Sequence, residues 1–99
     1  MVIVSLFYDD RSLASIKFRA EWNFHKKNCD GLAVFNEYNF NDQRNHTLYR
    51  SYGIGEVPTV LFIYRDRKRD EMVYSKLKRG GDIRERIIQI LKYHQKHLC

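Results

Sequence analysis

The segment that most constrains the fold is a nearly uninterrupted apolar run at the start of the chain, Val2 to Tyr8. Its β-branched and aromatic residues are typical of a β-strand, and Asp9 and Asp10 end it. Because the run is apolar at almost every position, both faces of the strand should be buried. The chain is therefore expected to form a sheet whose interior strand is covered on both sides.

Length and composition fit one small domain over residues 1–99. The chain has 99 residues, 43% of them hydrophobic, and a formal net charge of +6. A chain this short forms one core and no large closed active-site cavity, which excludes multidomain enzymes. No apolar run approaches the ~18 residues of a membrane span, and the start lacks a basic region and a small-residue cleavage site. We therefore expect a soluble, cytoplasmic protein with no membrane partner.

A helix, a second strand and a short helix should follow the first strand. Apolar residues recur at helical spacing over about 12–28, and Asp9, Asp10 or Ser12 can cap that helix. The segment 32–40 predicts a strand, and a helix opens at 41–43 and ends by Gly53. The apolar residues of the first helix are Leu13, Ile16, Ala20 and Phe24.

The second half predicts an antiparallel hairpin. Pro58, the only proline, directly precedes the apolar run 59–64. Because proline cannot donate to a sheet ladder, we expect it at the first position of that strand. A charged turn at 65–70 should connect to a second strand at 72–77.

A final helix completes the order β-α-β-α-β-β-α. Gly80 and Gly81 break the chain before it. Asp82 should cap the helix, with Glu85 three residues later as its capping-box partner. Its apolar stripe consists of Ile83, Ile87, Ile90, Leu91, His94 and Leu98.

This order resembles the minimal thioredoxin fold, and one motif supports the resemblance. The segment Tyr52-Gly53-Ile54-Gly55-Glu56-Val57-Pro58-Thr59 is similar to the Tyr-Gly-Ile-x-x-Val/Ile-Pro-Thr segment of thioredoxins. Asn39-Phe40-Asn41 stands where thioredoxins have Asn-Ile-Asp. The additional first strand and helix of thioredoxin are absent, so the outline is nearer to a glutaredoxin-sized core. The resemblance implies a thioredoxin-like three-layer α/β/α sandwich with a four-stranded mixed sheet.

The resemblance also implies roles for Val57 and Pro58. In the family this proline is cis, and the backbone of the residue before it pairs with an extended substrate segment. Periodicity alone would not predict a cis bond, because only ~5–6% of X-Pro bonds in folded proteins are cis. The alternative is a lone proline that merely begins an edge strand.

The chain departs from the family at the redox motif. Aligned on Phe7, the Cys-x-x-Cys at the start of the first helix becomes Ser12-Leu13-Ala14-Ser15. A serine hydroxyl is not appreciably ionised near neutral pH and cannot form a disulfide, so dithiol exchange is not expected. A nucleophilic Ser12 would need a nearby base, whereas helix capping needs none. The histidines that could serve, His25, His46, His94 and His97, fall toward the middle or far end of their elements.

Two further sites are considered on the resemblance. Gly80-Gly81-Asp82 is similar to the Gly-Gly-x-Asp of glutathione-binding glutaredoxins, but it is one residue short. The topology would place Cys29 and Cys99 near the same distal end of the first and last helices. Two free thiols, a Cys29–Cys99 disulfide and a Cys/His metal cluster are the alternatives, and the spacing matches no recognised zinc signature.

Positive charge is concentrated in the second half of the chain. Such charge can bind phosphates or an acidic protein surface, or simply form a solvated face, and no nucleic-acid motif accompanies it. The basic residues are Arg65, Arg67, Lys68 and Arg69 on the expected turn, Lys76, Lys78 and Arg79 after it, and Arg84, Arg86, Lys92 and Lys96 on the last helix.

These observations predict a redox-inactive thioredoxin-like domain that acts as a protein-interaction or assembly module. Its partner would be a protein or extended peptide, bound by β-type backbone pairing, with no cofactor or metal. The alternatives are a thiol-disulfide oxidoreductase or glutathione-using enzyme with a noncanonical site, and a basic nucleic-acid-binding protein. The candidate groove, a vestige of the redox site, consists of Arg11, Ser12, Ser15, Val57 and Pro58.

Overall fold

The computed structural model describes residues 2–29, 31–65, 67–73 and 82–96. The observed order of helices and strands confirms the expected β-α-β-α-β-β-α. The elements are β1 (Val2–Tyr8), α1 (Leu13–Asn28), β2 (Ala33–Asn39), the 3-10 helix η1 (Gln43–Asn45), α2 (His46–Ser51), β3 (Thr59–Tyr64), β4 (Arg67–Val73) and α3 (Asp82–Lys96).

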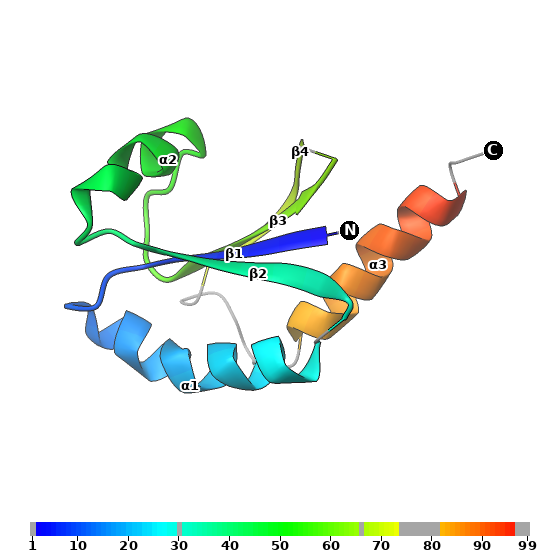
Figure 1. The fold of residues 1–99 in the computed structure, drawn as a ribbon, viewed down its shortest axis with the longest axis horizontal. Helices are drawn as coiled ribbons and strands as arrows, with labels where there is room; N and C mark the ends of the chain where they lie inside the picture. The colour runs from blue at the N-terminus through cyan, green and yellow to red at the C-terminus, as the bar shows by residue number, and fades with distance from the viewer. Residues whose placement is uncertain (1, 30, 66, 74–81, 97–99) are drawn as a thin grey trace.

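The strands form one mixed four-stranded sheet in the order β2-β1-β3-β4. β1 pairs parallel with β2 and antiparallel with β3, and β3 pairs antiparallel with β4. α1 and α3 lie on one side of this sheet and α2 lies on the other (Figure 1). The expected three-layer α/β/α sandwich is therefore confirmed, with β1 in its interior.

Alternation along β1 divides the core into two clusters. Val2, Val4 and Leu6 are buried against α1 and α3, whereas Phe7 is buried in the cluster that contains Tyr49 of α2. Successive residues of a strand point to opposite faces, so an apolar run at nearly every position fills both clusters. The expectation from this run, that the first strand is buried on both faces, is confirmed.

The buried face of α1 differs from the apolar stripe that its spacing suggested. Leu13, Ile16 and Phe24 are 66%, 57% and 64% exposed. The residues that face the sheet are Ser15, Phe18, Trp22 and His25.

The large apolar surface of Phe18 and Trp22 explains this orientation, because both rings are buried against the sheet. Position 15 lies three residues before Phe18 and seven before Trp22, so it shares their face of the helix. There the Ser15 hydroxyl accepts a hydrogen bond from the Asp9 amide over 3.2 Å. The expected stripe therefore faces solvent.

The turn between β3 and β4 is shorter than the charged segment 65–70 predicted. The predicted turn at 65–70 is wrong, because β4 begins at Arg67 and only Arg65 and position 66 separate the two strands. Arg65 has a positive φ of 53°. A register shift between Phe62 and Ile63 accommodates one extra residue in β4. Charged residues are tolerated in β4 because it is the edge strand of the sheet.

α3 matches its predicted stripe where the side chains are described. Ile83, Ile87 and Ile90 are buried, and Leu91 is half-buried. The His94 side chain, Leu98 and the expected strand positions 74–77 lie outside the described residues. Among the described helices, none is long and apolar enough to cross a membrane.

Two aromatic substitutions on α1 test its orientation. Trp22→Ala should lower the free energy of unfolding by about 3–5 kcal/mol, because it empties a fully buried site. Phe24→Ala, two residues away, should change it by less than about 0.5 kcal/mol, because the ring is exposed. Urea unfolding of dilute protein measures both. Equal losses for the two variants would contradict the observed orientation.

Candidate functional site

The loop from Asp9 to Ser12 connects β1 to the amino end of α1. Ser12 is the N-cap residue, and its hydroxyl accepts a hydrogen bond from the Ser15 amide over 3.4 Å. The Ser12 amide donates to the Asp9 carbonyl over 2.9 Å, which closes the loop into a tight turn. Ser15 is buried, with its hydroxyl bonded to the Asp9 amide. Both serine hydroxyls thus accept hydrogen bonds from backbone amides, Ser12 from the first turn of the helix and Ser15 from the loop after β1.

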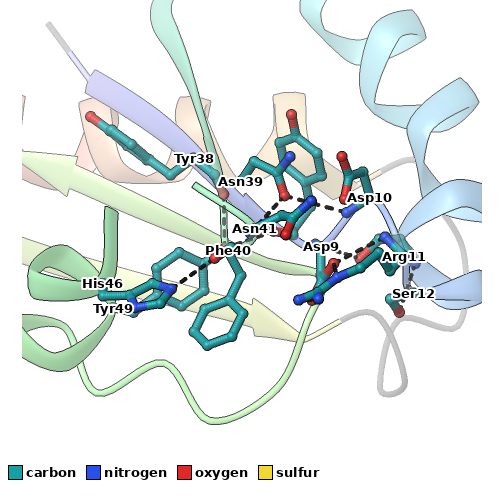
Figure 2. Close-up of polar contacts among 12 residues, drawn as sticks. Asp9, Asp10, Arg11, Ser12, Tyr38, Asn39, Phe40, Asn41, His46 and Tyr49 are labelled. Carbon is teal, nitrogen blue, oxygen red and sulfur yellow. Dashed lines mark hydrogen bonds and ion pairs between the residues drawn. The ribbon is translucent and has the colours of Figure 1, made fainter. Parts of the chain in front are cut away.

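Arg11 folds back onto the carboxylate of its own loop. Its Nε and terminal guanidinium nitrogen donate to the two Asp9 carboxylate oxygens over 3.0 and 3.1 Å, and its amide donates to one of them (Figure 2). These hydrogen bonds lower the pKa of Asp9 below its ordinary value. The Arg11 side chain remains 64% exposed, so its outer edge is accessible to a partner.

Asn39 at the end of β2 braces the same loop. Its side-chain oxygen accepts hydrogen bonds from the Asp10 amide over 3.4 Å and from the Asn41 amide over 3.1 Å (Figure 2). A single amide side chain therefore connects the loop after β1 to the loop after β2. In the sequence, Asn39 contributes only to the resemblance to thioredoxins. Its contact with the loop after β1 exists only because β1 pairs in parallel with β2.

Tyr49 of α2 joins the same strand ends from the opposite face. Its hydroxyl lies 2.8 Å from both the Tyr8 and the Tyr38 carbonyl oxygens, to which it can donate its proton. Burial raises the pKa of Tyr49 far above its ordinary value, which keeps the hydroxyl protonated as a donor. The Phe7 ring packs edge-on against Tyr49, with ring centroids 5.0 Å apart. Sequence analysis did not identify Tyr49 as part of the site.

Val57 and Pro58 lie at the same end of the sheet as the Asp9–Ser12 loop. The antiparallel register pairs Phe7 with Thr59, which places Pro58 beside the carboxyl end of β1. The Val57–Pro58 peptide bond is cis. Pro58 is buried and Val57 is half-buried. The predicted site residues thus come from two segments that the β1–β3 pairing brings to one edge.

A surface hollow of about 360 Å³ lies beside the amino end of α1. The Arg19 guanidinium lies over the Tyr8 ring, 4.8 Å from its centroid, and pairs with Glu37 of β2 over 2.7 Å. Of the predicted site residues, only Ser15 lines this hollow. No sequence pattern predicts this hollow, because its walls come from a strand end, a loop and one flank of a helix. The lining residues are Tyr8, Asp10, Ser15, Ile16 and Arg19.

Cys29 lies at the other end of α1. It is fully buried, and among the described residues its thiol is free, while the disulfide considered with Cys99 stays a prediction. Cys99 itself is outside the described residues. Burial raises the pKa of the Cys29 thiol and so disfavours the thiolate. Ser12 and Cys29 flank a 16-residue helix, which separates them by about 25 Å at 1.5 Å per residue.

Two further possibilities raised by the resemblance were a Cys/His metal cluster and a glutathione-binding motif. Within the described part of the chain, no group of three or more His, Cys, Asp or Glu side chains could hold a metal ion. Gly80 and Gly81 of the glutathione-type motif lie outside the described residues, and Asp82 is the first residue of α3. The glutathione hypothesis therefore stays a prediction.

Comparison with solved structures identifies the fold. A thioredoxin mutant from Halobacterium salinarum has a TM-score of 0.72 at 20% identity, covering 87% of this chain and 71% of that one. Malaria parasite thioredoxin-2 has a TM-score of 0.75 at 17% identity, covering 93% and 82%. A malarial protein has a TM-score of 0.71 at 16% identity, covering 100% and 99%. No protein-family model and no curated protein sequence matches the chain.

The chain therefore has a thioredoxin-like fold. This likeness confirms the resemblance that the proline motif and element order indicated. The malarial protein and this chain cover each other almost completely.

Removing the Arg11 guanidinium should raise the pKa of Asp9. Arg11→Ala deletes the side-chain hydrogen bonds that favour the carboxylate, so the pKa of Asp9 should rise toward the ordinary value of an aspartate. NMR titration of the carboxyl carbons measures it. Because the folded-state pKa is depressed, any stability from this pair is present above the unfolded-state pKa and is lost as the pH falls.

Arg44→Ala is the matched control, because Arg44 forms the same i,i+2 fork with Asp42. It should raise the pKa of Asp42 and leave Asp9 unchanged. An Asp9 pKa that does not respond to Arg11→Ala would contradict the described loop geometry.

Proposed function

We propose that this protein is a redox-inactive thioredoxin-like module that binds a protein or an extended peptide. The contact surface is the edge formed by the Asp9–Ser12 loop and the Val57–Pro58 segment. The binding residues are Arg11, Ser12, Ser15, Val57 and Pro58.

The observation that carries the proposal is the chemistry at the amino end of α1. Ser12 and Ser15 occupy this helix start, and both hydroxyls accept hydrogen bonds from backbone amides. A hydroxyl lacks the accessible ionised state that makes a thiol nucleophilic near neutral pH. Cys29 is buried at the far end of the helix with a raised thiol pKa, so it does not replace the missing sulfur.

The surrounding geometry favours binding. Pro58 is buried beside the end of β1, which fixes the backbone of half-buried Val57 at the sheet edge. Main-chain groups held in this way pair with an extended segment by strand addition. Exposed Arg11 and Asp10 add charge to this edge. Malaria parasite thioredoxin-2, a protein of similar fold, is described as a component of protein secretion machinery, which supports an assembly role.

An insulin-reduction assay with dithiothreitol tests the inactive chemistry. The wild-type protein should give turnover no higher than the dithiothreitol background, since no cysteine stands at the helix start. Cys29→Ser and Cys99→Ser are the matched variants. Turnover that is present in the wild type and lost in either variant would establish a noncanonical oxidoreductase and overturn the proposal.

Selection of peptides from a displayed library tests the binding function. A selected peptide, titrated into ¹⁵N-labelled protein, should shift the amide signals of Arg11, Ser12 and Val57. Arg11→Glu should weaken binding of acidic peptides by about tenfold, whereas the control Arg50→Glu on α2 should not. Failure to select any peptide, or shifts confined to other surfaces, would contradict the proposed site. Binding of DNA that decreases with salt would support the nucleic-acid alternative instead.

A further inference from the structure

The outer face of α1 is apolar over most of its length. Leu13, Ile16 and Phe24 are 66%, 57% and 64% exposed, and Ala20 between them is also exposed. Their spacing of three, four and four residues places them in one stripe on the helix. Single apolar side chains are normal on a surface, whereas a contiguous apolar stripe is a candidate interaction site.

The charges beside this stripe are of both signs. Exposed Lys17 and half-buried Glu21 lie on the same border of it, at about 40° and 80° around the helix from Leu13. Arg19 and Lys26 pair with Glu37 of β2 and so belong to the sheet side of the helix. One border of the stripe therefore has a cation at Lys17 and, one turn later, an anion at Glu21.

The positions of Lys17 and Glu21 on α1 complement those on α1 of a second copy. Two copies of α1 packed antiparallel about a two-fold axis bring the same border of each helix together. If Leu13 lies opposite the partner's Phe24, the register places position 16 opposite the partner's Glu21. Lys17 is one residue, about 1.5 Å along the axis, from that position. Each Lys17 can thus pair with the partner's Glu21, and the contact occurs twice in an isologous interface.

We propose that the protein self-associates through this face, with α1 packed antiparallel on α1 of a second copy. Leu13 and Phe24 form the apolar ends of the contact, and the small side chain of Ala20 allows close approach near its centre. Glu21 at the border disfavours an anionic membrane as the occupant, because such a surface would repel it. This surface is separate from the edge at Val57 and Pro58, so the proposal does not depend on peptide binding there.

The contact is small, so the dimer is weak. One helix face on each side buries less than the ~1,200–2,000 Å² of a standard stable interface. A reversible equilibrium that depends on protein concentration is therefore expected. Sedimentation equilibrium from low to high micromolar protein, at moderate salt, should show the dimer fraction of the wild type rise with concentration.

Charge reversal provides the decisive test. Lys17→Glu alone places an acidic residue opposite the partner's Glu21 at both contacts, and Glu21→Lys alone places a basic residue opposite the partner's Lys17 at both contacts. Each variant should dimerise about tenfold more weakly than the wild type, since both ion pairs become like-charge contacts. An equimolar mixture of the two variants should dimerise at least as well as the wild type, because every facing pair is then Glu against Lys.

Matched controls separate this effect from net charge and folding. Lys92→Glu and Glu85→Lys make the same charge changes on exposed positions of α3 and should leave dimerisation unchanged. Circular dichroism confirms that each variant is folded. A wild type that stays monomeric at the highest concentration, or a mixture no more dimeric than its components, would overturn the proposal. A monomer that instead binds anionic phospholipid vesicles would overturn it too.

Discussion

The burial of Phe18 and Trp22 under the sheet is the constraint on which the arrangement of α1 depends. Two buried aromatic rings stabilise this arrangement by more than any single hydrogen bond of the adjoining loop. With these rings toward the sheet, Ser15 lies on the same face of the helix and its hydroxyl accepts a hydrogen bond from the Asp9 amide. Leu13 and Phe24 then face solvent. The packing of α1 thus also places Ser12 and Ser15 at the end of the sheet where Pro58 lies.

Much of the fold follows from local patterns in the sequence. The apolar run at Val2–Tyr8 predicted a strand buried on both faces, and the Val57-Pro58-Thr59 motif indicated the thioredoxin-like arrangement. The rotation of α1 could not be predicted in this way, because its exposed and buried stripes both have helical spacing. The start of β4 was also predicted wrongly, because a charge-rich segment is typical of a turn. Charged residues fit a strand here because β4 lies at the edge of the sheet.

The candidate site was predictable only where residues lie close in sequence or match a motif. Ser12 as the helix cap needed no knowledge of the sheet. Asn39 and Tyr49, which hold the strand ends together, act through partners from other strands, and these contacts exist only after β1 and β2 pair. The hollow beside Arg19 likewise has no local signature, because its walls meet only in the folded chain.

We propose that the surface formed by the Asp9–Ser12 loop and the Val57–Pro58 segment lacks only sulfur atoms at positions 12 and 15 for dithiol exchange. The double variant Ser12→Cys/Ser15→Cys tests it most directly, because a helix start brings positions i and i+3 close enough for a disulfide. Mass spectrometry and insulin reduction, with the wild type measured beside it, follow the introduced cysteines. The variant should form an intramolecular disulfide between these positions and gain turnover that the wild type lacks. A folded variant whose introduced thiols stay unpaired under oxidising conditions and give no turnover would contradict it.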